Sequence, residues 1–136
     1  MSKSDAHENE YLLYAFHGTP PSWSMAADFY LSLHTADPGE GGSQTTNEAS
    51  YSGYARVAVP RDSGGWTVTG GIASNAAEVQ FPLASSGPQV ITHVGIGIAL
   101  SGAGGLLWRC ALGSPVTVGP GGRVTIAAGA LTVTES

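Results

Sequence analysis

The sequence contains one cysteine, one lysine and no long apolar run. The single thiol, Cys110, excludes an intramolecular disulfide framework and a cysteine-rich zinc module. No apolar stretch approaches the roughly 20 residues that cross a bilayer. The N-terminal residues MSKSDAHENE are too polar for the apolar part of a secretory signal. We therefore expect one domain of 136 residues, large enough to bury a core without covalent staples.

Charged residues are also scarce: they make up 11% of the chain, and the net charge is −5 at pH 7. The five basic residues form no cluster, so we expect neither direct nucleic-acid binding nor a membrane contact. Between residues 79 and 134 the only charged residues are Arg109 and Arg123. Interfaces are depleted of Lys, Glu and Asp but keep Arg. This region is therefore either the Ser/Thr/Gly surface of a glycine-rich β-protein or a surface partly covered by a permanent partner.

Motifs of catalysis and metal binding are missing too. The four histidines have no metal-site spacing, and no G-x-S-x-G or P-loop motif occurs. We predict a surface or turn-stabilising role for His34, a turn at Asp37, and a buried, inert position for Cys110. The sequence thus predicts no enzyme, no metal and no cofactor.

One helix is predicted, over residues 4–16. Ser4 is a good N-terminal cap, and Gly18 is a good stop signal. Three apolar residues recur at helical spacing: Leu12, Leu13 and Phe16. Together with Pro20 and Pro21, this helix defines a segment 1–24, which either reaches a partner as an arm or covers one end of the remaining domain.

Beyond residue 25, apolar and polar residues alternate with the period of a β-strand. Eight such segments are separated by glycine-rich turns: 29–34, 54–59, 66–69, 77–81, 93–98, 106–112, 123–126 and 131–134. The pattern predicts an all-β fold, with about eight short antiparallel strands in a jelly-roll-like β-sandwich over residues 25–136, and a closed barrel is the alternative. The connection 36–51 has no core pattern and is predicted as an ordered or mobile excursion.

Five residues are candidates for contact with a partner: Trp23, Arg56, Arg61, Gly95 and Gly97. Trp23 lies outside the strands and is the best candidate for an exposed anchor. The two arginines pair either with acids of a partner or with this chain's own Asp62 or Glu48. The two glycines leave one strand face bare, which marks a tight bend or bulge, or the docking of a second chain or of the N-terminal helix.

Long stretches of the chain resemble a family of small proteins encoded among the structural genes of tailed phages. Members are often labelled tail fibre proteins. Besides the opening residues 2–18, the matching stretches are YLSLHTADPGE (30–40), GSQTTNE (42–48), YSGYARVAVPR (51–61), GWTVTGGIASN (65–75), THVGIGIA (92–99) and AAGALTVT (127–134).

One line of that family resembles capsid cement, or decoration, proteins, which are jelly-roll β-sandwiches that clamp major capsid subunits. This resemblance implies a virion protein on the capsid exterior, made in the bacterial cytoplasm. Its partners would be the major capsid protein and a second copy of itself, as a homodimer or trimer. The alternative is a tail-fibre or tail-tip module that binds a host glycan or another tail protein. Because no coiled-coil or β-helical shaft repeat is visible, the sequence favours a place on the head over one on the tail.

Overall fold

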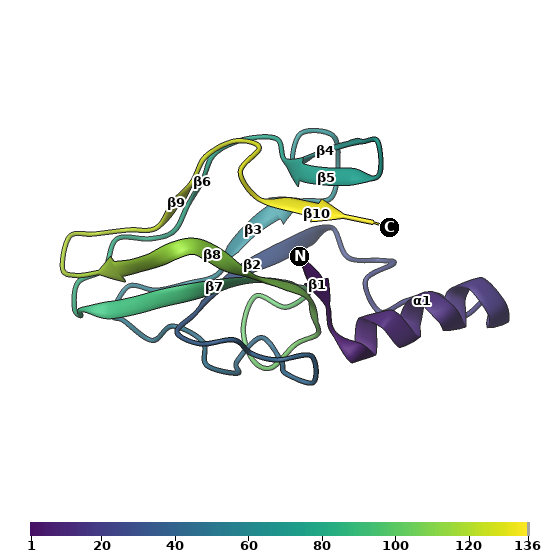
Figure 1. Cartoon of the computed structure of the whole chain (residues 1–136), viewed down its shortest axis with the longest axis horizontal. Helices are drawn as coiled ribbons and strands as arrows, with labels where there is room; N and C mark the ends of the chain where they lie inside the picture. Colours follow the sequence, from purple (N-terminus) through teal and green to yellow (C-terminus); the bar gives the residue numbers. More distant parts are fainter. Residues whose placement is uncertain (136) are drawn as a thin grey trace.

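The computed structural model describes residues 1–135, which form one helix and a set of antiparallel β-strands (Figure 1). In chain order the elements are β1 (Ser2–Lys3), α1 (Asp5–His17), β2 (Asp28–His34), β3 (Val57–Pro60), β4 (Trp66–Thr69), β5 (Ile72–Asn75), β6 (Val79–Gln80), β7 (Gln89–Gly97), β8 (Leu106–Val118), β9 (Thr125–Ile126) and β10 (Thr132–Thr134). The predicted all-β fold with one short N-terminal helix is confirmed.

The strands form three sheets among the described residues. The largest has the order β1-β8-β7-β2-β3, and the smaller two are β10-β5-β4 and β6-β9. Figure 1 shows the smaller sheets lying opposite β2, β7 and β8, in the manner of a sandwich. β1 pairs with β8, so residues 2–3 belong to the main sheet although they precede the predicted boundary at residue 24.

Within residues 1–135, ten strands take the place of the eight predicted, and they are not divided into the two sheets of a jelly roll. The pattern misses β1, β5, the first four residues of β7 and the second half of β8, since pairing through backbone hydrogen bonds needs no apolar alternation. The Gly70-Gly71 turn is confirmed: its φ angles of +59° and +76° are those of a hairpin turn, and it joins β4 to β5.

The core lies between the two layers. The main sheet contributes Leu31, Leu33, Ile91, Val94 and Ile96, and the opposite layer contributes Val79, Phe81, Ile126, Leu131 and Val133. All of these side chains are buried. Each of the smaller sheets is therefore held mainly by apolar packing against the larger sheet.

The connection between β2 and β3 is ordered and packs onto the main sheet. Its Gln44 is fully buried. The Gln44 side chain donates from Nε2 to the carbonyl of Ala99 (3.2 Å) and accepts at Oε1 from the Ala99 amide (3.0 Å). A Cβ on Gly97 would overlap the Gln44 side chain, and one on Gly95 would lie 2.8 Å from Leu106 Cδ1. The bare glycine stripe is thus filled by this chain itself.

Arg56 forms a buried ion pair inside the chain. Its Nε and Nη2 donate to the two carboxylate oxygens of Glu48, at 2.7 and 2.8 Å. Its guanidinium also donates to the carbonyls of Ala99 (2.9 Å) and Gly102 (2.6 Å). Of the two alternatives for Arg56, the structure shows the pairing with the chain's own Glu48. Hydrogen bonding to that carboxylate is the main reason that the pKa of Arg56 is raised.

His34 is buried, so its predicted surface role is wrong, whereas the turn-stabilising alternative fits its hydrogen bond to Thr46 in the turn 44–47. β2 lies inside the main sheet, and His34 is fully buried. Its Nδ1 donates to the carbonyl of Thr46 (2.8 Å), because a carbonyl can only accept. Its Nε2 then accepts from the Ser32 hydroxyl (2.8 Å). His34 stands at a polar position of the alternating strand pattern. It is nevertheless buried, because the connection between β2 and β3 covers it.

We expect Gly97→Ala to lower the free energy of unfolding by about 1–3 kcal/mol, because the new methyl group overpacks against buried Gln44. Gly113→Ala is the matched control, since Gly113 lies in β8 with no atom near the position of its Cβ. Urea unfolding at pH 7 measures both. Equal midpoints for the two variants would show that Gln44 moves aside without cost.

Candidate functional site

The helix α1 is fixed at both ends by its own sequence. The Ser4 hydroxyl oxygen accepts from the His7 amide (3.2 Å) and donates its proton to the Leu106 carbonyl (2.6 Å). Gly18, with φ of +69°, donates its amide to the Tyr14 carbonyl (3.1 Å), as a helix-ending glycine does. The predicted helix over residues 4–16 is confirmed to within one residue at each end.

The first turns of α1 are anchored to the sheets through His7, which is fully buried. The His7 ring packs edge-on against Trp108, with 4.4 Å between ring centroids. Its Nδ1 accepts from the indole nitrogen of Trp23 (3.3 Å), so the ring proton resides on Nε2 when the imidazole is neutral. Burial lowers the pKa of His7, although the neighbouring Glu10 opposes that change.

Trp23 and Arg61 extend this anchor along the chain. Arg61 Nη1 donates to the carbonyls of Trp23 (2.8 Å) and Ala26 (2.6 Å). The guanidinium also lies 5.2 Å from the Trp23 ring centroid and 5.1 Å from that of Phe29. Trp23 is half-buried against this chain, and Arg61 binds carbonyl oxygens in place of the predicted Asp62 or Glu48. Both residues hold the helix and its following turn in place.

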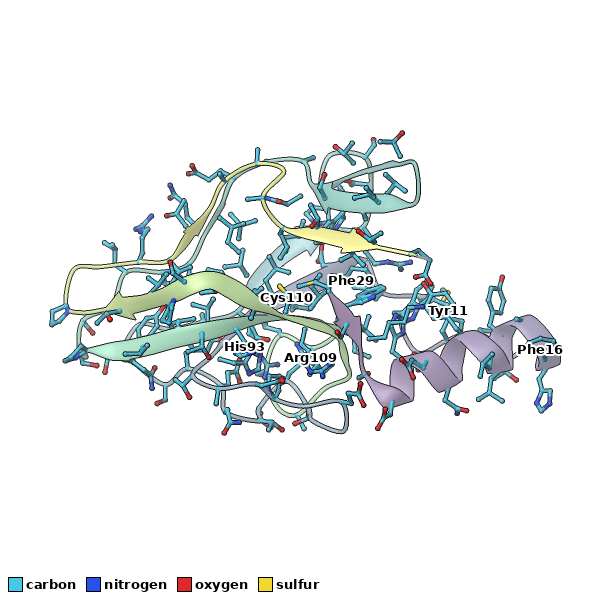
Figure 2. All side chains as sticks on the ribbon, in the orientation of Figure 1. Tyr11, Phe16, Phe29, His93, Arg109 and Cys110 are labelled. Atoms are coloured by element: carbon cyan, nitrogen blue, oxygen red, sulfur yellow. The ribbon has the colours of Figure 1, made fainter. Side chains whose placement is uncertain are left out.

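The second half of α1 lies outside this anchor and projects from the sheets (Figure 1). Phe16 is 81% exposed and Leu12 is 58% exposed, and Figure 2 shows Phe16 near the far end of the helix. From Tyr11 to Gly18 the only titratable groups are the two tyrosine hydroxyls and His17. We call the exposed residues Leu12, Tyr14, Phe16 and His17 the helix tip. Two of the three residues of the predicted apolar stripe therefore remain in solvent, while the third, Leu13, is half-buried.

A groove of about 620 Å³ opens beside the base of α1. It has four aromatic side chains, from Tyr11, Phe29, Trp66 and Trp108. Its aliphatic wall comes from Val68, Ile72 and Val133, and its polar edge includes Asp62, Ser63 and Glu135. Figure 2 shows Tyr11 and Phe29 near the strands from which the helix departs. We call this site the aromatic groove.

Most of the charge around the aromatic groove is already paired or hydrogen-bonded. Lys3 Nζ lies 2.6 Å from a Glu135 carboxylate oxygen and 4.4 Å from the Tyr11 ring centroid. Asp62 Oδ1 accepts from the amides of Gly64 (2.9 Å) and Gly65 (3.0 Å). Val68 remains 73% exposed at the groove. The groove is therefore suited to binding apolar or aromatic groups.

The groups considered for chemistry lie outside the aromatic groove, and Cys110 is half-buried where full burial is predicted. Burial raises the pKa of the half-buried Cys110 thiol, which disfavours a reactive thiolate. Asp37 accepts from the Gly39 amide in the predicted turn and pairs with Arg109 at 2.9 Å, and both contacts lower its pKa. Within residues 1–135, no three His, Cys, Asp or Glu side chains are grouped to hold a metal. No helix in that range could cross a membrane.

The helix is predictable from the sequence, but the aromatic groove is not. Of the candidate residues, Trp23 and Arg61 meet at the helix base, and Arg56 and Gly97 contact the 36–51 connection. Gly95 faces Leu106, Ser32 and His34. The groove joins residues from α1, β2, β4 and β8, which are far apart in the chain. Val68 is exposed, although the sequence pattern places it on the apolar face of its strand. No feature of the sequence predicts this exposure.

Two comparisons with known proteins bear on the chain. A family model described as Podophage GP4 fiber I protein gp80 matches residues 2–134. None of the curated proteins compared with the chain matches it.

We expect the free energy of unfolding to fall as the pH drops below about 6.5, the ordinary pKa of histidine. Burial lowers the pKa of His7 and His34, so below that pH the unfolded chain binds more protons than the folded one. The contribution of these two histidines to the free energy of unfolding is complete above pH 6.5 and is lost on acidification. Urea unfolding between pH 5 and 8 measures this slope.

His7→Gln and His34→Gln each remove one of these titrations and flatten that slope. His17→Gln, at the exposed helix tip, is the control and keeps it. A slope that is unchanged in both buried variants would contradict the assignment to His7 and His34.

Proposed function

The chain belongs to the family of the podophage GP4 fibre I protein gp80, and we propose that it is an assembly module of the phage fibre that docks through its helix tip. The family makes it a bacteriophage structural protein and a virion component. Its description favours the tail-fibre alternative over the predicted capsid cement. Of the two partners in that alternative, we propose another fibre protein and not a host glycan, because the projecting helix tip is apolar.

The observation that carries this proposal is the projecting half of α1. A globular chain gains stability by burying apolar side chains, yet Leu12 and Phe16 remain in solvent at the end of a well-capped helix. Exposed apolar residues grouped on one rigid element are typical of protein–protein interaction sites. The helix is held in this position by His7, Trp23 and Arg61, which makes the exposure a property of the folded chain.

The charge distribution supports a role in a permanent assembly. The chain has one lysine, and α1 carries no acid beyond Glu10. Surfaces that remain in solvent usually keep more charge than this. A module that is covered by neighbouring virion proteins needs less charge for solubility, and its function requires no catalytic group.

We expect phage particles to contain few copies of this chain relative to the major capsid protein, measured by quantitative gel densitometry. Phage that lack the chain should keep DNA-filled heads and lose adsorption to the host, because a fibre component acts outside the shell. Hundreds of copies per particle, with leakage of DNA when the chain is absent, would instead support the capsid-cement prediction.

The single variant Leu12→Ser tests the helix tip within the particle. We expect it to reduce incorporation of the chain by about tenfold or more, as for a buried interface anchor. Leu100→Ser is the matched control, since Leu100 is 63% exposed on a loop outside the groove and the helix. Equal incorporation of both variants would contradict docking through the tip.

A further inference from the structure

We propose, as an extension that rests on the fibre function above, that the helix tip of one copy docks in the aromatic groove of a second copy of this chain. The partner of the exposed helix is then the protein itself. The docking residues of the tip are Leu12 and Phe16, and the receiving side chains include Trp66, Val68 and Ile72.

The tip cannot occupy the groove of its own chain. Tyr11, in the middle of α1, already lines that groove, and the residues after it lead away from the sheets (Figure 2). A helix of 13 residues is about 20 Å long and rigid. Its base is held by β1, Ser4 and His7. Each folded copy therefore presents an apolar projection and an apolar groove, neither of which its own chain can satisfy.

The two surfaces match in chemistry. The tip presents an aromatic ring and an aliphatic side chain, and the groove presents aromatic rings beside Val68 and Ile72. Aromatic pairs in edge-to-face contact contribute more than their buried area alone, and the folded chain already uses such pairs at Phe29 and Trp108. A volume of about 620 Å³ is within the range of protein sites that enclose a ligand.

Charge does not oppose this contact. The tip has no carboxylate, and its one basic side chain is His17. The groove edge carries the carboxylates of Asp62 and Glu135, the guanidinium of Arg61 and, beside Glu135, the ammonium of Lys3. Because two acids are balanced by two bases, an apolar tip meets no net charge there. The acidic residues of α1 are Asp5, Glu8 and Glu10. All three lie in the first half of the helix, before the tip begins.

Because the tip and the groove are different surfaces, one contact leaves a groove free on one copy and a tip free on the other. Repetition then produces a closed pair, a ring or a filament, according to the rotation between neighbours. Such repetition suits a fibre. The other side of the molecule, with Leu83 and Val90 exposed, is not needed for the contact.

Analytical ultracentrifugation of the full chain tests the proposal. We expect the natural chain to associate as its concentration rises, with Phe16→Ser and Val68→Lys each weakening that association by about tenfold or more. Both residues are exposed, so their replacement spares the core. Leu100→Ser should associate like the natural chain. Circular dichroism and urea unfolding confirm that each variant is folded.

The decisive measurement mixes the two weakened variants. Phe16→Ser keeps an intact groove and Val68→Lys keeps an intact tip, so an equimolar mixture should form a 1:1 complex that stops at two chains. A mixture that stays monomeric while the natural chain associates would overturn the tip-in-groove contact. A natural chain that stays monomeric at every concentration would also overturn it. That second result would leave the fibre function intact, because the particle experiments with Leu12→Ser test it separately.

Discussion

The packing of buried His7 against Trp108 and Trp23 is the contact on which the functional interpretation depends. It joins the first half of α1 to the main sheet and to the turn that follows the helix. Helices of this length are only marginally stable alone, so α1 depends on this packing. With it, the helix has one direction, and the helix tip and the aromatic groove are held apart on the same molecule.

A second constraint acts on the opposite side of the main sheet. The connection between β2 and β3 places Gln44 on Gly97 and Glu48 on Arg56. Each polar group is matched: the amide of Gln44 meets the backbone of Ala99, and the guanidinium meets a carboxylate in two hydrogen bonds. Buried polar groups destabilise a fold unless they are bonded in this way. The long connection is therefore part of the core, and the glycine face of β7 is covered by this chain itself.

The helix tip and the aromatic groove differ in how far the sequence alone reveals them. The tip is one continuous segment, so its apolar residues are visible in the chain, although their spacing suggests packing on the chain's own sheet. The groove combines a helix, six strands of the two larger sheets and the residues near Asp62 and Glu135. Only the antiparallel arrangement of β2, β8 and the β4–β5 hairpin brings its rings together.

The sequence by itself determined the fold class, the limits of the helix and the absence of a catalytic motif. These depend on local physics: Ser4 and Gly18 cap a helix through neighbouring backbone groups, and period-two alternation gives a strand one apolar face. The tertiary structure alone decided that His34 and Gln44 are buried, that Trp23 and Arg61 bind within the chain, and that Phe16 remains exposed. Burial depends on which segments cover a residue, and residues such as Gln44 and Ala99 meet across 55 positions of chain. A local pattern of apolar and polar residues does not predict such a long-range contact.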